Sequence, residues 1–517
     1  MLARDDTPAM LIAMPQGLGV NGVVSWALRL AGVMADRGWR VVIAAHREPK
    51  GHARVDHALH AGVELADLRH LPPIDTPGIS LAPFVEEYRT ALESLGWSRQ
   101  RPAIVLPSLE ANCYAAAAAL ASTHGDRLRV IGWQHSDNPF DASMLQNYEP
   151  MFSAVACVSQ HITTKLRQRL PWRSADVHRI PYGVELGEPP ETREQRPIEL
   201  IYPGRMEHEA RRVGVLCEVA RLLHDDGVPH RLTLVGDGPA AAEVDQRLDG
   251  LPNARRLDGL PRSELRPKIA AADALLLTSR YEGLNVAMLE AMASGVAPIV
   301  TRVESGAAEA IEHGVSGLLI EAGYHEGEHA IARRMTDAIA LLATDRNMLD
   351  AMRAAAYERA AQRYSLGVHG EACEELFTST LAAEPRWWPL DRPCTLVSDH
   401  AASPSSSVPP DATERAARAI AAIEGPIAIY GAGRHTLALA EVLARANVVC
   451  IIDDDPKNHG TTLWGWPVVG LDQVSPGTSV LVSSFIHQDA MEQRLHTRGL
   501  EAITLYELAD GAGSCSS

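Results

Sequence analysis

The chain has 517 residues, enough for about three domains with separate hydrophobic cores. Its formal net charge of −17 at pH 7 argues against a nucleic-acid-binding protein, because that charge repels a phosphate backbone. The seven cysteines are scattered, which indicates a reducing compartment and neither a disulfide framework nor a cysteine zinc site. The N-terminus lacks a basic segment followed by an apolar core, so we expect a soluble cytoplasmic protein.

Residues 10–195 alternate short apolar runs with amphipathic stretches, a pattern that predicts a doubly wound α/β domain. Two of its loops follow expected strands at their carboxyl ends, where open α/β sheets bind ligands. The first contains Asn21 and Gly22 before a helix, and glycine lets the backbone approach a ligand closely. The second contains His135. Residues 164–173 mix cations with leucine and tryptophan, which fits either a solvated helix or a face that touches anionic lipid.

Residues 196–383 repeat the same alternation of strands and helices. The first strand of this series ends in Gly204 and Arg205, and Arg211 follows at the start of the next helix, with a second arginine beside it. Cations at the carboxyl end of a strand could clamp a diphosphate, although a solvated helix start would carry the same residues. A further tight turn, at Gly236, also lies between a strand and a helix.

The most informative segment is residues 279–295, which holds Glu282 and Glu290 eight positions apart. An apolar strand precedes this segment, and the helix inside it is closed by Gly295. Glu282 is therefore predicted to lie in the ligand-binding crevice at the carboxyl edge of the sheet. The backbone amides that follow it form a helix N-terminus suited to a phosphate group. These amides belong to Gly283, Leu284 and Asn285.

The C-terminal part of the chain has a different organisation. Residues 384–410 are rich in proline, serine and aspartate and predict a flexible linker. Residues 411–510 form a third βα unit, in which Gly431 and Gly433 follow a strand and Asp453 ends the next one. This arrangement matches a dinucleotide-binding βαβ unit, except that a threonine replaces the third glycine.

The segment around Glu282 and Glu290 resembles the Glu-x7-Glu signature of the retaining family-4 glycosyltransferases, also described as glycosyl transferases group 1. The resemblance implies the GT-B fold, in which two Rossmann-like domains face a cleft. Residues 10–195 would be the acceptor-side domain and residues 196–383 the nucleotide-sugar donor domain. The implied activity is that of a hexosyltransferase-type enzyme of polysaccharide biosynthesis. It would move a sugar from a nucleotide-diphosphate sugar to a glycan or lipid-linked acceptor, at the inner face of a membrane or in the cytoplasm.

The resemblance also implies roles for individual residues. Glu290 would bind the ribose hydroxyls, and Glu282 would lie beside the transferred sugar. Arg205 and Arg211 would offset charge on the leaving diphosphate; the family has a lysine where Arg211 is the best match. His135 would contact a donor-sugar hydroxyl or the leaving phosphate. The other implied donor contacts are Asn21, Gly22, Gly204, Gly236, Gly283, Leu284 and Asn285.

Retention would proceed by attack on the front face of the sugar, with the leaving diphosphate helping to remove the acceptor proton. No metal is required in this scheme, and no Asp-x-Asp motif lies in a suitable loop of the first two series. The third unit is similar to small Rossmann-like domains attached to sugar methyltransferases and sugar acyltransferases. It fits both a site for NAD or another nucleotide and a docking module without a ligand. Its site would use Gly431, Gly433 and Asp453.

Three other hypotheses compete with the transferase. An NAD-dependent sugar-nucleotide oxidoreductase would use the third unit, but no Tyr-x-x-x-Lys pair follows its glycine turn. A GT-B sugar-nucleotide epimerase would need no acceptor. A catalytically silent binding protein is disfavoured because both glutamates and both arginine positions are present. The sequence does not fix the donor sugar, its base or the oligomeric state.

Overall fold

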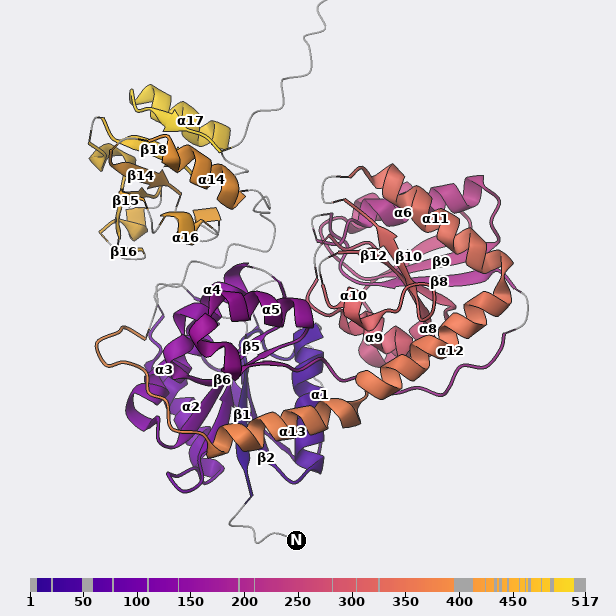
Figure 1. Ribbon diagram of the computed structural model, residues 1–517, viewed down its shortest axis with the longest axis horizontal. Coiled ribbons are helices and arrows are strands. Elements are labelled where there is room, and N and C mark those ends of the chain that lie inside the picture. The colour runs from indigo at the N-terminus through magenta and orange to yellow at the C-terminus, as the bar shows by residue number, and fades with distance from the viewer. Residues whose placement is uncertain are drawn as a thin grey trace, which may run out of the picture. The chain divides into compact units, whose positions relative to one another are not determined.

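The computed structural model describes residues 7–505, apart from 20–21, 49–58, 77–78, 109–110, 138, 194–195, 209, 281, 304, 324–325, 395–411, 424, 432–434, 437–438, 444–445, 455, 461, 464–465, 476 and 484–487 (Figure 1). The chain divides into two compact units, Met1–Cys394 and Thr395–Ser517. No helix in the part of the chain that the structure describes is both long and apolar enough to cross a membrane.

The first sheet of the first unit has seven parallel strands in the order β3-β2-β1-β4-β5-β6-β7. β1, β4 and β5 are almost entirely apolar and buried, as expected for parallel strands covered by helices on both faces. The strands are β1 (Ala9–Met14), β2 (Arg40–His46), β3 (Val63–Leu68), β4 (Ala103–Leu106), β5 (Leu128–Gln134), β6 (Phe152–Cys157) and β7 (Val177–Arg179). The helices are α1 (Gly22–Asp36), α2 (Ala82–Ser94), α3 (Ala111–His124), α4 (Pro139–Asn147) and α5 (Gln160–Arg169).

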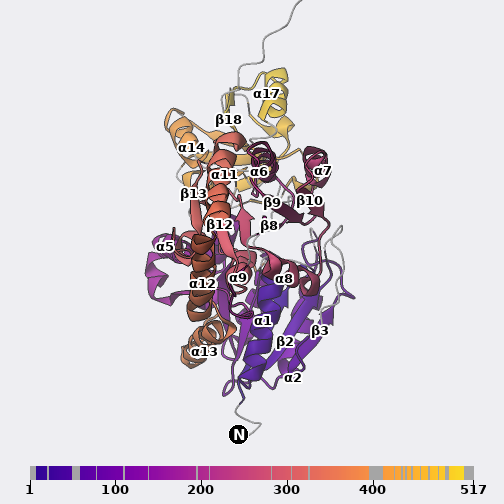
Figure 2. The ribbon, with the colours of Figure 1, turned by 90° about the vertical axis from the view of Figure 1, so that its right-hand side faces the viewer.

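The second sheet has six parallel strands in the order β10-β9-β8-β11-β12-β13, the order of a doubly wound nucleotide-binding sheet. Helices α6 and α11 pack against each other (Figure 2). The strands are β8 (Ile198–Pro203), β9 (His230–Val235), β10 (Ala254–Leu257), β11 (Ala274–Leu277), β12 (Ala297–Arg302) and β13 (Leu318–Glu321). The helices are α6 (Val213–Asp225), α7 (Ala241–Leu248), α8 (Arg262–Ala271), α9 (Val286–Met292), α10 (Ala307–Ala310), α11 (Glu328–Thr344), α12 (Arg346–Arg363) and α13 (Leu366–Ala382).

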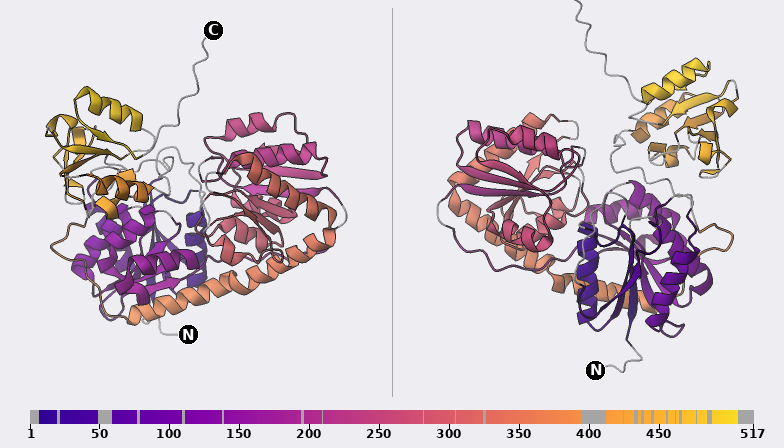
Figure 3. Two further views of the ribbon diagram at one scale, coloured as in Figure 1. Left: turned by 45° about the horizontal axis from the view of Figure 1, so that its top comes forward. Right: turned by 180° about the vertical axis from the view of Figure 1, so that it is seen from behind.

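Helix α13 follows the second sheet in sequence but packs on α1 and β4 of the first sheet. Figure 3 shows α12 and α13 in succession, leading from one sheet to the other. Arg37, just after α1, donates to Glu374 of α13 at 2.6 Å, and the rings of Trp39 and Phe377 lie 5.7 Å apart. The chain between residues 366 and 382 therefore ties the two domains of the first unit together.

The segment 384–394 was predicted as the start of the linker, but in the structure it belongs to the first unit. Trp388 is buried, and its ring lies 5.4 Å from that of Tyr148. The hydroxyl of Tyr148 donates to the carbonyl of Cys394 at 3.1 Å. Burial of this large aromatic side chain explains the difference, because the polar composition of the segment conceals one strong apolar anchor. The remainder of the predicted linker lies outside the described residues.

The second unit contains a six-stranded sheet in the order β16-β17-β15-β14-β18-β19. All pairings are parallel except that of β16 with β17, so the βαβ arrangement predicted for this unit is confirmed. The strands are β14 (Ile427–Tyr430), β15 (Val448–Ile452), β16 (Thr462–Leu463), β17 (Trp466–Val469), β18 (Ser479–Val482) and β19 (Ala502–Ile503). The helices are α14 (Ala412–Ala421), α16 (Ala440–Leu443) and α17 (Gln488–Thr497).

Candidate functional site

The turn between β11 and α9 holds Glu282 in a fixed position. Asn285 caps α9, because its side-chain oxygen accepts a hydrogen bond from the amide of Met288 at 2.9 Å. The amide nitrogen of the same side chain donates to Glu282 Oε1 at 2.8 Å, and the hydroxyl of Ser279 donates to that oxygen at 3.1 Å. Arg211 forms an ion pair with it. The carboxylate predicted to lie beside a sugar is thus oriented by an amide, a hydroxyl and a guanidinium group.

Arg211 reaches Glu282 from a loop that the end of β11 holds in place. The hydroxyl of Thr278 donates to the carbonyl of Arg211 at 2.6 Å. The amide of Arg280 donates to the carbonyl of Ala210 at 2.8 Å. The next residue, Arg212, has a left-handed backbone (φ +47°), alone among the non-glycine residues that the structure describes. Backbone strain of this kind persists only where the surroundings enforce it, and here it adjoins the predicted site.

Arg205, the other predicted cation, has a different environment. Its side chain is 54% exposed, and its nearest carboxylate, that of Glu207, lies 3.6 Å away. Arg211 is 27% exposed and also donates to the hydroxyl of Ser279 at 3.1 Å. Of the two arginines, Arg211 is therefore the one that the structure places with Glu282.

Glycines allow the predicted loops to come together. A Cβ on Gly283 would lie 2.2 Å from the carbonyl oxygen of His135, so the turn after β11 touches the loop after β5. A Cβ on Gly236 would lie 2.0 Å from the carbonyl oxygen of Gly204, so the turns after β8 and β9 also meet. Gly22, at the start of α1, lies opposite Val286 of α9. Leu284 is buried, and Asn21 lies outside the described residues.

Glu290 lies one turn into α9 and contacts cations of both domains. It forms ion pairs with Arg29 of α1 and, at 3.3 Å, with Arg262 of α8. Glu185 in turn pairs with Arg262 at 3.3 Å and with Arg266. The carboxylate predicted to bind ribose therefore belongs to a cluster of three arginines and two glutamates.

His135 is enclosed by protein groups. Its Nδ1 lies 2.8 Å from the hydroxyl of Tyr182, and its Nε2 lies 3.3 Å from the hydroxyl of Ser108. Burial lowers the pKa of His135 to about 3, so the ring is neutral at ordinary pH. What His135 presents to the turn after β11 is its backbone carbonyl. Its predicted contact with a donor through the imidazole stays a prediction, and it would require one of these hydroxyls to move.

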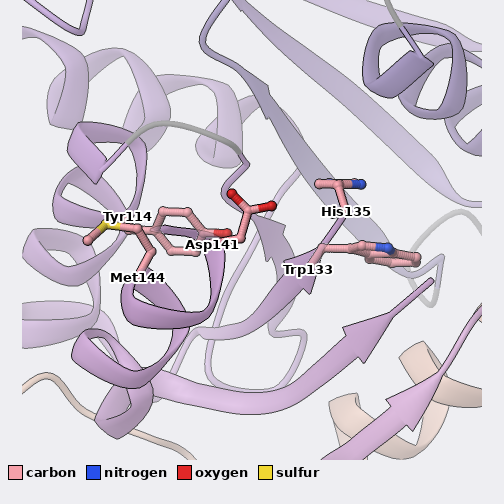
Figure 4. A pocket seen from close by; sticks show the side chains of 5 residues that line it. All are labelled: Tyr114, Trp133, His135, Asp141 and Met144. Atoms are coloured by element: carbon pink, nitrogen blue, oxygen red, sulfur yellow. The ribbon is translucent and has the colours of Figure 1, made fainter. Parts of the chain in front are cut away.

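A small hollow lies beside His135 in the first domain. Figure 4 shows Asp141 and Tyr114 on one side of it and His135 and Trp133 on the other. The carboxylate of Asp141 accepts hydrogen bonds from the amide and the hydroxyl of Ser136, at 3.3 and 3.1 Å. The lining residues are Tyr114, Trp133, His135, Asp141 and Met144.

The basic run 164–173 is engaged mainly by other protein groups. Lys165 pairs with Asp137 at 2.7 Å, and Arg169 donates to the side chain of Gln146 at 2.6 Å. Trp172 is 66% exposed. Because these two cations have protein partners, the structure weakens the case for a lipid-binding face, and the membrane contact stays a prediction.

In the second unit, the carboxyl ends of β14 and β18 carry neutral polar groups. The hydroxyl of Thr436 donates to the carbonyl of Gly431 and lies 2.7 Å from the hydroxyl of Ser483. The hydroxyl of Ser483 in turn lies 3.0 Å from Nδ1 of His435. Burial lowers the pKa of His435 to about 4. The φ of Gly431 is +114°, a backbone conformation that favours glycine. The backbone carbonyl of Asp453, another predicted residue, lies 2.8 Å from Nε2 of His459. Gly433, the remaining predicted residue, lies outside the described residues.

Sequence reasoning missed Arg29 and Arg262. Arg29 lies in an otherwise apolar stretch of α1, and its partner is 261 positions away, so no local pattern could reveal the pair. Within the described ranges, no group of three or more histidine, cysteine, aspartate or glutamate residues could hold a metal ion, and the six cysteines there are free.

Two family models match the first unit. Residues 20–188 match "Glycosyltransferase Family 4", and residues 197–341 match "Glycosyl transferases group 1". The two α/β domains of the first unit thus each match a glycosyltransferase family model, and together they have the GT-B fold. The predicted fold is confirmed, and both domains match models of the predicted kind, while the retaining mechanism stays a prediction.

Similar proteins agree with this assignment. The chain is 33% identical over 150 residues to the amylovoran biosynthesis glycosyltransferase AmsK of Erwinia amylovora, across 27% of this chain and 36% of that protein. It spans about a third to two fifths of the length of the first curated relatives that it matches.

Two solved structures share the fold. Sucrose-phosphate synthase of Thermosynechococcus elongatus matches with a TM-score of 0.57 at 18% identity, over 73% of this chain and 100% of that one. Anabaena HepE in complex with UDP and glucose matches with a TM-score of 0.55 at 16% identity, over 72% of this chain and 100% of that one.

Proposed function

We propose that this protein transfers a sugar from a nucleotide-diphosphate sugar to a glycan or lipid-linked acceptor, with retention of anomeric configuration. The observation that carries the proposal is the arrangement of Glu282 and Glu290, one in the turn before α9 and one within it, each paired with an arginine. Two similar proteins support it. HepE was solved with UDP and glucose, and AmsK is described as a biosynthetic glycosyltransferase.

In this proposal the second domain supplies position and charge. The amides of the turn before α9 hold the diphosphate at a helix N-terminus. Arg211, which pairs with Glu282, offsets the charge that grows on the leaving diphosphate in this proposal. Glu282, held by Ser279 and Asn285, orients the transferred sugar. The acceptor hydroxyl attacks the front face of the anomeric carbon as the bond to the diphosphate breaks, and its proton passes to a diphosphate oxygen.

The arginine contacts also favour transfer without a divalent cation, because fixed guanidinium groups can offset phosphate charge. The check is the initial rate with and without EDTA, using protein that has been dialysed against the chelator. Equal rates are expected. A rate that falls on chelation and returns with magnesium or manganese would overturn this part of the proposal.

The main test is a screen of UDP-, GDP-, ADP- and dTDP-sugars with the whole chain, by calorimetry and thermal shift, followed by product analysis. We expect one donor class to bind, and NMR of the product should show the anomeric configuration of the donor. NAD(H) belongs in the same screen because of the third sheet. Conversion of the nucleotide sugar without an acceptor would favour the epimerase instead. Reduction of NAD would favour the oxidoreductase.

A further inference from the structure

We propose that Arg29, on α1 of the first domain, is a positioning residue that presents Glu290 to the ribose hydroxyls of the nucleoside diphosphate. This inference rests on the proposed function, because it takes Glu290 as the ribose-binding group. It adds that recognition of the nucleotide depends on a side chain from the opposite domain. No role was predicted for Arg29 from the sequence.

The contacts show how Arg29 controls the carboxylate. One terminal nitrogen of its guanidinium group bonds to Glu290 Oε1, and the other lies 3.4 Å from the carbonyl of Gly183. The arginine side chain is 3% exposed and that of Glu290 is 12% exposed, so water competes little for the pair. Charge-assisted bonds in such surroundings are short and directional. The rotamer of Glu290 is therefore set largely from α1.

The carboxylate keeps one oxygen for a ligand. Arg29 and Arg262 both contact Oε1 of Glu290. Among the described residues, Oε2 has no hydrogen-bond partner. A carboxylate accepts hydrogen bonds at both oxygens, and ribose hydroxyls are donors. The arrangement thus fixes the carboxylate by one oxygen and offers the other to a neutral donor group.

The charges around the pair favour this use of one carboxylate oxygen for the arginines and the other for the ligand. The cluster contains Arg29, Arg262, Arg266, Glu185 and Glu290, an excess of one cation. Burial lowers the pKa of Arg29, and Glu290 opposes that shift. Removing Arg29 would leave the remaining charges equal in number. Glu290 would then be held only from its own domain, by Arg262, whose Nε lies 3.3 Å away.

A merely structural bridge between domains would have different consequences. It would affect folding or the affinity for every nucleotide alike. A positioning role affects specifically the contribution of the ribose hydroxyls to binding affinity, because Glu290 is proposed to accept hydrogen bonds from those hydroxyls. The ratio of affinities for a ribonucleotide and its deoxy analogue isolates this contribution from changes in overall stability.

The experiment is calorimetric titration of the full chain with UDP and 2′-deoxy-UDP, and likewise with GDP or ADP and their 2′-deoxy analogues if the donor screen selects another base. We expect the unsubstituted protein to prefer the ribonucleotide by about 10-fold or more, and Arg29→Met to reduce this preference to less than about 3-fold. Arg29→Lys keeps the charge but loses one of the two contacts, so an intermediate preference is expected even if Arg29→Met fails to fold.

Arg37→Met is the matched control. Arg37 directly follows the last residue of α1 and also bridges to the second half of the first unit, through Glu374 at 2.6 Å. It does not touch Glu290, so the preference for the ribonucleotide should persist. An unchanged preference for the ribonucleotide in both Arg29 variants would overturn the inference. Tighter binding of UDP by the Arg29 variants than by the unsubstituted protein would also overturn it, because Arg29 would then keep Glu290 from the ligand.

The test separates this inference from the proposed function. If sugar transfer is observed but the unsubstituted protein binds both nucleotides equally, Glu290 does not read the ribose and the inference fails alone. If the preference follows Arg29 as expected but no donor sugar is transferred to any acceptor, the proposed function fails and the positioning role stands.

Discussion

The second and third sheets share an architecture but differ in the chemistry at the point where strand order reverses. Between β8 and β11 the carboxyl edge carries Arg211, Ser279 and Glu282, which are joined by charged hydrogen bonds. Between β14 and β18 it carries His435 and Ser483, linked through neutral groups. Ligands of open α/β sheets bind at such points in both cases. The comparison shows that the fold fixes where a ligand binds, whereas the side chains decide which chemistry is available.

The largest effect is expected from the carboxylate that distinguishes the second sheet. Glu282→Gln keeps the size of the side chain but removes its charge. Turnover should fall by about 100-fold or more, while affinity for the donor changes by less than about 3-fold, because the interaction is made mainly in the transition state. Steady-state kinetics and calorimetry give the two quantities. Glu290→Ala should do the opposite and weaken donor binding more than turnover.

Glu312→Gln is the control for Glu282→Gln, since Glu312 is 61% exposed and its pairing with Arg359 is long, at 3.6 Å. Its kinetics should match those of the unsubstituted protein. Equal and small effects at Glu282 and Glu290 would remove the site from the second sheet, and with it the contrast between the two sheets.

The next largest effect separates the two arginines. Arg211→Ala should lower kcat/KM by about 30-fold or more, because it removes a guanidinium group from Glu282 and from the predicted phosphate position. Arg205→Ala should lower it by less than about 5-fold, since Arg205 is largely exposed and its pairing is long. A larger loss at Arg205 would show that donor binding draws this side chain into the site.

Much of this arrangement follows from local sequence. The order of strand, glycine turn and helix around Glu282 predicted the turn and the helix α9 that carries Glu290, although not the capping of α9 by the side chain of Asn285. Gly236 and Gly283 also lie where the backbone of another loop approaches, because only a residue without Cβ fits there, and a Cβ on Gly204 would meet the ring of Tyr202.

The parts that could not be predicted depend on contacts between distant segments. The pairing of Arg29 with Glu290 and the return of α13 to the first sheet join residues that no periodicity relates. The enclosure of His135 is a similar case, since Ser108 and Tyr182 come from different loops. Trp388 was hidden in a polar segment whose composition alone indicated a linker.

Each of the two units buries a neutral histidine, His135 beside the first sheet and His435 beside the third, so pH offers a further comparison of the units. Burial lowers the pKa of His135 to about 3, against about 6.5 in an unfolded chain. The unfolded state therefore binds a proton that the folded state does not, so stability is retained above pH 6.5 and is lost progressively as the pH falls toward 3. The slope is at most about 1.4 kcal/mol per pH unit for one histidine.

The check is the difference in Tm between pH 7.5 and pH 5.5. His135→Gln should show a smaller difference than the unsubstituted protein, whatever its Tm at pH 7.5, because glutamine does not titrate. His435→Gln should do the same for the second unit, where burial lowers the histidine pKa to about 4. An unchanged difference in His135→Gln would mean that the folded protein protonates His135 as readily as the unfolded chain does.

The smallest effect is expected from the neutral hydroxyl groups of Thr436 and Ser483 in the second unit. Replacing Thr436 by valine and Ser483 by alanine together removes the hydroxyl groups that bond to each other at 2.7 Å. Because these groups carry no charge to offset that of a leaving diphosphate, kcat/KM for transfer should change by less than about 2-fold, beside the large loss in Arg211→Ala. The calorimetric transition of the second unit shows whether it stays folded. A loss of 10-fold or more in a folded double variant would mean that the third sheet takes part in donor chemistry, and that neutral groups at a reversal of strand order can serve transfer as well as charged ones.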